Sequence, residues 1–359
     1  MFLLDLPAEC ILHIVRKLDN ARDILSLACL CRYLYPLIKA ELYRFNREEQ
    51  TSSALHWAAS RGKLAMVDNF LREFHLDINA VINNHTPLML AAANGFQALV
   101  ARLLSEEQLD VNVCNSWHQT ALHLAIEQFH EDVAHTLLLD CRVDAEWTAL
   151  DDCTPLMAAA RNGLDKVVQA LLDREHLDVN AHTSFGYTAL HLAVSEGFQS
   201  VARMLLLDNR VSINCKDRLG ATPLWWATAT NNECIVHLLL DKDEIDLDSG
   251  TREGPPLHNV VQFGDLPTIR RLLREPRLDP NLTDAYGNTA LTRAAARGDL
   301  RIIEALLQDC RVNIGIRNHA GESPVMVARR FGFHIAATIL QTSHRRKGIS
   351  GKIQSADCQ

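Results

Sequence analysis

Four histidines recur along the chain at nearly constant spacing, and histidine is a common metal ligand and proton carrier. They are His56, His123, His191 and His258, at separations of 67, 68 and 67 residues. A zinc site would need several of their ring nitrogens within about 2 Å of one ion. Whether these side chains can meet depends on the elements that carry them.

Each histidine is the fourth residue of a six-residue pattern that recurs nine times. The clearest copy is Thr188-Ala189-Leu190-His191-Leu192-Ala193. The first residues of the copies, here called anchors, are Ser53, Thr86, Thr120, Thr154, Thr188, Thr222, Pro255, Thr289 and Ser323, separated by 33 or 34 residues. A constant step of this length indicates a repeat protein.

The residues within each copy predict two short helices. Thr followed by Pro, as at Thr86-Pro87, begins a helix, because Thr caps free amides and Pro is tolerated at the first helical position. A glycine nine positions after the anchor, found in seven copies, ends that helix. Apolar pairs such as Leu205-Leu206 mark a second helix, and an Asn or Asp then begins a polar link. The unit is helix, turn, helix and hairpin-like tip.

This pattern resembles the ankyrin repeat, whose signature is Thr-Pro-Leu-His-x-Ala on a step of about 33 residues. The resemblance implies an all-α solenoid of nine helix-turn-helix units with hairpin-like tips, over residues 53–342. The histidines then lie two repeats apart, so no two can share a metal ion. We expect each to bond locally, between its helix and the neighbouring tip.

Residues 1–46 lie outside the repeat register and predict three short apolar helices. Their pattern is Leu6-Pro7-x-Glu9, Ile11, Leu12, Ile14, Leu18-Asp19, Asp23, Leu25, Leu27 and Leu30-Cys31-Arg32. The segment resembles an F-box, with Leu34 at a place that is usually aromatic. The resemblance implies binding to the Skp-type adaptor of a cullin-RING ubiquitin ligase, through Leu6, Pro7, Glu9, Ile11, Leu12 and Leu30. The alternative is a helical cap that covers the N-terminal end of the stack.

Two further segments complete the expected organisation. A short polar linker, residues 47–52, joins the F-box-like segment to the array, and a basic tail, residues 343–359, is expected to be disordered. Some copies depart from the pattern. The fourth has Ala149-Leu150-Asp151-Asp152 in place of a regular tip, and the sixth has Asn231 in place of the glycine.

In the ankyrin family the tips and the exposed ends of the first helices bind partners. The resemblance therefore places target-binding residues there, and our candidates are Trp117, Phe185, Tyr187, Leu219, Tyr286, Arg161, Phe263 and Arg297. Trp, Phe and Tyr aligned along one edge are typical of an interface hot spot. The alternative is that each tip aromatic packs onto the adjacent tip.

Composition narrows the class of protein. The net charge, 36 minus 44, is −8, which gives no reason to expect a nucleic-acid partner. The ten cysteines are scattered without paired spacing and are expected to be reduced thiols. No apolar run reaches the roughly 18 residues of a membrane helix, so we expect no membrane partner and a location in the cytoplasm or nucleus. No phosphate loop, paired-cysteine metal site or Ser-His-acid motif stands out, and we expect no catalysis, cofactor or metal.

These observations predict the substrate-recognition subunit of a cullin-RING (SCF-type) ubiquitin ligase. The F-box-like segment would hold the adaptor and cullin, and the array would hold an unknown protein target. The alternative is an ankyrin-repeat interaction scaffold with a helical N-cap and no ligase role.

Overall fold

The computed structural model describes residues 53–74 and 76–354. The segment predicted to be F-box-like, residues 1–46, and the linker, residues 47–52, lie outside this part of the chain. Within it the fold is all-α, with eighteen α-helices and one short 3₁₀-helix. Here β-structure is limited to three isolated bridges, Ile82 with His85, Thr251 with Gly254 and Thr283 with Thr289. Among the described helices, none has the length and apolarity needed to cross a bilayer.

The helices form two compact units, one ending at Asp178 and the other beginning at Val179. Unit 1 contains α4 (Ser53–Ser60), α5 (Leu64–Phe74), α6 (Pro87–Ala93), α7 (Gln97–Leu104), α8 (Ala121–Glu127), α9 (Glu131–Leu138), η2 (Leu150–Asp152), α10 (Pro155–Asn162) and α11 (Asp165–Leu172). Its first helices, α4, α6, α8 and α10, pack side by side, and its second helices, α5, α7, α9 and α11, form the adjoining layer. This is the solenoid that the repeat pattern predicts.

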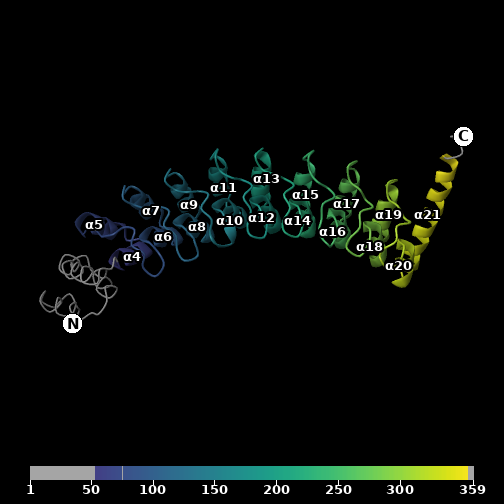
Figure 1. Cartoon of the computed structure of the whole chain (residues 1–359), viewed down its shortest axis with the longest axis horizontal. Helices are drawn as coiled ribbons and strands as arrows, with labels where there is room; N and C mark the ends of the chain where they lie inside the picture. Colours follow the sequence, from purple (N-terminus) through teal and green to yellow (C-terminus); the bar gives the residue numbers. More distant parts are fainter. Residues whose placement is uncertain (1–52, 75, 355–359) are drawn as a thin grey trace. The chain divides into compact units, whose positions relative to one another are not determined.

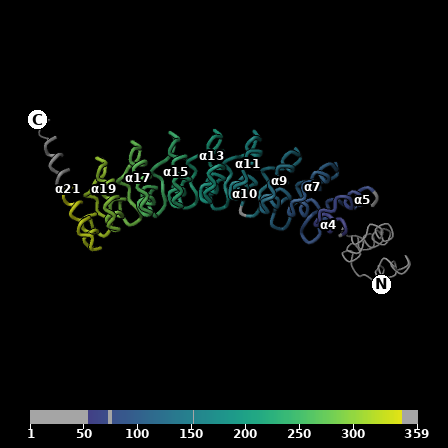
Figure 2. Tube along the Cα trace, turned by 180° about the vertical axis from the view of Figure 1, so that it is seen from behind, coloured from purple at the N-terminus to yellow at the C-terminus, as the bar shows by residue number. Residues whose placement is uncertain are grey.

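Unit 2 repeats the same arrangement with five helix pairs. It contains α12 (Ala189–Glu196), α13 (Gln199–Leu207), α14 (Pro223–Ala229), α15 (Glu233–Leu240), α16 (Pro256–Phe263), α17 (Leu266–Leu273), α18 (Ala290–Arg297), α19 (Leu300–Gln308), α20 (Pro324–Arg330) and α21 (His334–Gln354). Each first helix contacts the next first helix, and each second helix the next second helix. Figure 2 shows this order of pairs from behind.

The anchor residues begin the first helices as predicted. The Thr86 hydroxyl accepts a 3.2 Å hydrogen bond from the Met89 amide, which satisfies one of the free amides at the helix start. Four more anchors do the same at 3.2 to 3.5 Å: Thr154, Thr188, Thr222 and Thr289. The leucine two places later is buried in each unit, for example Leu88 and Leu190. The hexad therefore supplies both a cap and a core side chain.

Two repeats make the turn between their helices without glycine. Phe129 and Asn231 adopt φ angles of 58° and 54°, in the left-handed region where the other copies have glycine. Asn tolerates this conformation because its short polar side chain bonds locally, whereas a bulky residue such as Phe adopts it at a cost. The turn is therefore retained where its usual residue is lost.

The C-terminal helix, α21, runs from His334 to Gln354. The disorder expected of the tail, residues 343–359, stays a prediction. Buried Ala336, Ala337 and Leu340 fix the first turns of α21 in the core of unit 2. Once a helix is nucleated, each further residue is added at little cost.

Candidate protein-binding surface

A single polar side chain, five positions before the anchor, holds each regular tip. In unit 2 the Oδ1 atom of Asp217 accepts hydrogen bonds from the amides of Leu219 (2.8 Å) and Ala221 (2.9 Å). The same pair of bonds is made by Asn115, Thr183, Asp284 and Asn318. Because the first of the two amides belongs to the residue three places before the anchor, that residue is held in a fixed turn.

The side chains presented by these turns are the predicted strip. Trp117, Phe185, Leu219 and Tyr286 are 52%, 54%, 67% and 67% exposed. More than half of each of these four residues is therefore accessible to a partner. An exposed apolar side chain on an ordered turn loses little conformational freedom when a partner covers it.

The strip is not one continuous row. Trp117 belongs to unit 1, whereas Phe185, Leu219 and Tyr286 belong to unit 2. In unit 2 the place between Leu219 and Tyr286 is occupied by exposed Arg252. Arg252 is not among the residues predicted for the strip.

Neighbouring tips are joined by backbone hydrogen bonds. In unit 2 the Arg218 amide donates to the Phe185 carbonyl (3.0 Å), and the Ala285 amide donates to the Arg252 carbonyl (3.0 Å). In unit 1 the Leu150 amide donates to the Trp117 carbonyl (3.3 Å). These bonds fix the spacing of the exposed side chains within each unit.

An aromatic cluster supports the first tip of unit 2. The rings of Tyr187 and Trp226 meet edge to face with centroids 5.8 Å apart, and Phe185 lies 6.4 Å from Tyr187. Trp225 packs at 5.4 Å on the other side of Trp226. Burial, and then the nearby charge of Asp217, raise the pKa of Tyr187. Predicted Tyr187 is thus half-buried and supports the tip, while Phe185 is the more exposed member.

Trp226 also belongs to this site, although it is not among the predicted target-binding residues. Its indole Nε1 donates a 2.9 Å hydrogen bond to Oδ2 of Asp217, the carboxylate that holds the tip. The signal was available, because Trp226 occupies the variable place of the Thr-Pro-Leu-His-x-Ala signature. That place faces the preceding tip.

The same place in the eighth repeat holds an arginine. Arg293 binds Oδ2 of Asp284 at 2.9 Å, and Glu253 lies 3.6 Å from the same guanidinium. Burial alone would raise the pKa of Asp284, but hydrogen bonds from the Asn288 amide and from Arg293 outweigh it and lower the pKa. The Asp284 side chain is 1% exposed, so its charge is neutralised within the protein.

The irregular fourth tip lies against the tip that carries Trp117. The indole of Trp147 donates to the His118 carbonyl (3.0 Å), and η2 begins at exposed Leu150. Loss of the regular tip therefore adds an apolar residue beside Trp117.

The three remaining candidates lie at the ends of first helices. Arg161, Phe263 and Arg297 fall in the last turns of α10, α16 and α18, and all three are exposed. Within the described residues, neither Arg161 nor Arg297 makes an ion pair. No contact brings these residues together with the tips, so they remain candidates on position alone.

The histidines of the hexads bond locally, as expected. Nε2 of His56 lies 2.9 Å from the Ala80 carbonyl oxygen, Nε2 of His191 lies 3.3 Å from that of Ala221, and Nε2 of His258 lies 2.8 Å from that of Asn288. Each acceptor belongs to the next tip. In the described residues no three His, Cys, Asp or Glu side chains are grouped so as to hold a metal ion.

Nδ1 of His123 lies 3.0 Å from the hydroxyl of its own anchor, Thr120, and Nδ1 of His191 lies 2.9 Å from that of Thr188. Burial lowers the pKa of His123 and that of His258 to about 4. Both are therefore neutral structural residues at pH 7.

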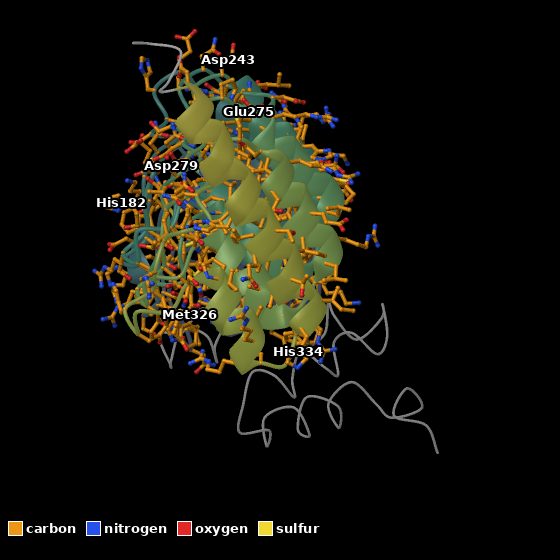
Figure 3. The ribbon with its side chains drawn as sticks, turned by 90° about the vertical axis from the view of Figure 1, so that its right-hand side faces the viewer. His182, Asp243, Glu275, Asp279, Met326 and His334 are labelled. Atoms are coloured by element: carbon orange, nitrogen blue, oxygen red, sulfur yellow. The ribbon has the colours of Figure 1, made fainter. Side chains whose placement is uncertain are left out.

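The loops that follow the second helices form a separate polar region. Figure 3 shows Asp243 and Glu275 in these loops, at the opposite end of the view from His334, which begins α21. In five of these loops an asparagine donates from Nδ2 to a carbonyl of the next loop and accepts from an amide there. These residues are Asn79, Asn112, Asn180, Asn214 and Asn281. Glu146 and Asp248 take this place in two repeats and only accept.

Basic side chains in the same loops cap the second helix of the preceding repeat. The Arg142 guanidinium donates to the Leu104 carbonyl at 2.6 Å, and Arg311 does the same with Leu273 at 2.6 Å. Asp140 and Asp309 hold these two arginines. Such bonds satisfy carbonyls left free at a helix C-terminus and place positive charge there. This region is structural and polar, whereas Trp117, Phe185 and Tyr286 lie on the tips.

Comparison with known families gives matches along most of the chain. A model of ankyrin repeats in three copies matches residues 9–113, 55–147, 136–217 and 156–251. A model of ankyrin repeats in many copies matches residues 257–307. The first match begins at residue 9, within the segment that resembles an F-box.

Proposed function

Because the chain belongs to the ankyrin-repeat family, a family of protein-interaction solenoids, we propose that it binds a protein target through its tips. The observation that carries this proposal is the exposure of Phe185 and Leu219 on turns that Thr183 and Asp217 hold by paired hydrogen bonds. Large apolar side chains in an ordered frame are typical of binding hot spots. Trp117, Tyr187, Tyr286, Arg161, Phe263 and Arg297 are the further target-binding candidates.

The test is a triple variant, Trp117→Ala, Phe185→Ala and Tyr286→Ala, in the full chain. Proteins that co-purify from cell lysate would be identified and quantified by mass spectrometry. The control is Leu139→Ala with Leu207→Ala, two leucines that are 74% and 72% exposed at the ends of second helices. We expect the triple variant to lose partners that the control retains. Retention of every partner at wild-type level by the triple variant would refute target binding by the tips.

A second function concerns residues 1–46, and the observation that favours it is the pair of motifs Leu6-Pro7-x-Glu9 and Leu30-Cys31-Arg32. We propose that this segment docks on a Skp-type adaptor and cullin, so that the chain is the target receptor of a ubiquitin ligase in the cytoplasm or nucleus. The chain itself performs no chemistry under this proposal. It raises the effective concentration of a target lysine near a charged enzyme bound elsewhere in the complex.

Adaptor binding separates this function from a scaffold with a helical cap. Purified adaptor would be titrated against the intact chain, the variant Leu6→Ala with Pro7→Ala, and a chain that starts at Thr51. The ligase proposal predicts binding by the intact chain alone, and an unchanged urea midpoint of the array in the variant. A cap predicts no adaptor binding by any form, together with a lowered midpoint.

A further inference from the structure

The tips of unit 2 combine apolar and basic side chains. Phe185, Arg218, Leu219, Arg252 and Tyr286 are all exposed, and they are here called the unit 2 tip surface. Phe185 is bonded to Arg218 through the backbone, and a Cβ at Gly220 would lie 3.3 Å from the Gly250 carbonyl oxygen of the next tip. The tips therefore follow one another closely, and apolar and basic side chains alternate along them.

Several acidic groups beside this surface have partners within unit 2. Asp217 accepts from two tip amides and from the Trp226 indole, and Asp284 is paired with Arg293. Glu322 in the last tip is paired with Arg330 at 3.1 Å. Each of these three carboxylates has its partner inside unit 2. Glu253, which follows Arg252, is 66% exposed and shares the Arg293 guanidinium with Asp284, so it is the acidic side chain left open beside the surface.

The two arginines of the surface, in contrast, lack such partners. Within the described residues neither Arg218 nor Arg252 makes an ion pair or a side-chain hydrogen bond. Both are exposed, on a chain whose net charge is −8. Arginine binds carboxylates through two parallel N–H donors, which makes an exposed unpaired arginine a specific receptor for acidic side chains.

We propose that the unit 2 tip surface binds an acidic peptide segment that carries large apolar side chains. The inference rests on the proposed function, protein binding by the tips, and adds the chemistry of the partner. The apolar side chains would cover Phe185, Leu219 and Tyr286, while Asp or Glu residues between them would meet Arg218 and Arg252. Apolar contact would supply most of the affinity, and charge would supply selectivity.

A selection from random peptides tests this chemistry without assuming a sequence. A display library of short random peptides would be selected on the full chain and, in parallel, on the double variant Arg218→Glu with Arg252→Glu. We expect wild-type selections to be enriched in Asp and Glu together with Phe, Trp or Leu, and the double variant to reverse the charge preference. Enrichment in Lys or Arg on the wild type, the same sequences on both proteins, or no enrichment at all would overturn the proposal.

The best selected peptide would then be measured by fluorescence anisotropy. Phe185→Ala and Leu219→Ala should each weaken binding by about tenfold, and added salt should weaken it further. Leu207→Ala and Arg203→Glu, exposed positions on α13, are the matched controls and should bind like the wild type. Equal losses in test and control variants would overturn the assignment to the tips.

Two other results distinguish this inference from the function on which it rests. If the Trp117, Phe185 and Tyr286 triple variant loses its cellular partners but no acidic peptides are enriched, protein binding by the tips stands and the acidic partner is wrong. Sedimentation of the full chain with vesicles of phosphatidylserine and phosphatidylcholine would, if lost in the Arg218 and Arg252 variant, assign the surface to a membrane and overturn the peptide proposal.

Discussion

Trp226 and Asp217 are joined across a helix start by a 2.9 Å hydrogen bond from the indole to the carboxylate. Asp217 holds the tip with its other oxygen, so one side chain links the exposed tip to the first helix of the same repeat. Asp284 and Arg293, also nine residues apart, form the equivalent link in the eighth repeat. The tip geometry of unit 2 therefore depends on two carboxylates, Asp217 and Asp284, each of which bonds both to tip amides and to a side chain of the first helix.

The first prediction concerns the indole bond. Trp226→Phe should lower the free energy of unfolding by about 1–2 kcal/mol, because a buried carboxylate oxygen loses its donor. Urea denaturation followed by circular dichroism measures the change. The comparison is Trp147→Phe, whose lost bond ends on the carbonyl of exposed His118, where water can replace it. Equal losses in the two variants would contradict the role of burial.

The second prediction concerns Asp284 in acid. Its pKa is lowered in the folded protein, so the stabilisation is complete above the pKa of an unfolded carboxyl and is lost as the pH falls through the folded value. Arg293→Met should cost about 3 kcal/mol at neutral pH, since it leaves a buried charge unpaired. The variant should also lose less further stability between neutral pH and strong acid than the wild type. Parallel curves of unfolding free energy against pH would rule this out.

The third prediction concerns the buried histidines, whose pKa values move the opposite way from those of a paired histidine. His123 and His258 have pKa values of about 4, against 6.5 for an unperturbed imidazole, so the unfolded state binds protons first. Stability is therefore full above pH 6.5 and falls between pH 6.5 and about 4, by up to about 3 kcal/mol for each residue.

Replacing His123 alone tests its contribution to the pH dependence of stability. Met89 and Met157 occupy the place of His123 in neighbouring repeats, so His123→Met is a change that the fold accepts elsewhere. We expect this variant to be less sensitive to pH in that interval, as measured by thermal unfolding at a series of pH values. A variant with the same dependence on pH as the wild type would contradict the role given to His123.

The fourth prediction concerns the loop asparagines. Asn281 donates to the Arg311 carbonyl (2.9 Å) and accepts from the Asn313 amide (2.7 Å). Asn281→Asp keeps only the accepting half and should cost about 1 kcal/mol, whereas Asn281→Ala loses both halves and should cost more. Chemical denaturation would rank them. An aspartate variant as unstable as the alanine variant would show that the accepting half contributes nothing.

The sequence predicted those parts of the fold that depend on near neighbours. Thr188 caps the helix that it begins, and His191, three residues later, bonds to the next tip because a repeat of constant step places that tip beside it. The exposure of Phe185 and Tyr286 was predictable for the same reason, since their distance from the anchor is constant. Periodicity thus carries information about every contact that recurs.

Contacts whose direction the repeat pattern does not show were not predictable. The guanidinium of Arg142 reaches Leu104, thirty-eight residues earlier, and the pattern Asp140-Cys141-Arg142 does not show its direction. The bond of Trp226 to Asp217 depends on a side chain unique to one repeat. The binding role of the strip stays a prediction, because exposure shows what is available to a partner and not what that partner is.

The exchange of asparagine for a carboxylate at Asp248 has a consequence for how unit 2 comes apart. In a stack where each repeat is stabilised mainly by its neighbours, unfolding spreads from the interface with the lowest coupling energy. Asp248 accepts from the Asp279 amide, but its carboxylate has no hydrogen to donate. This side chain therefore couples the seventh and eighth repeats by accepting only, whereas Asn281 both donates and accepts. Hydrogen exchange of the backbone amides in α18 to α21 should accordingly report a separate opening with a lower free energy. The reason is that Asp248 has a carboxylate oxygen where Asn214 and Asn281 have an amide nitrogen.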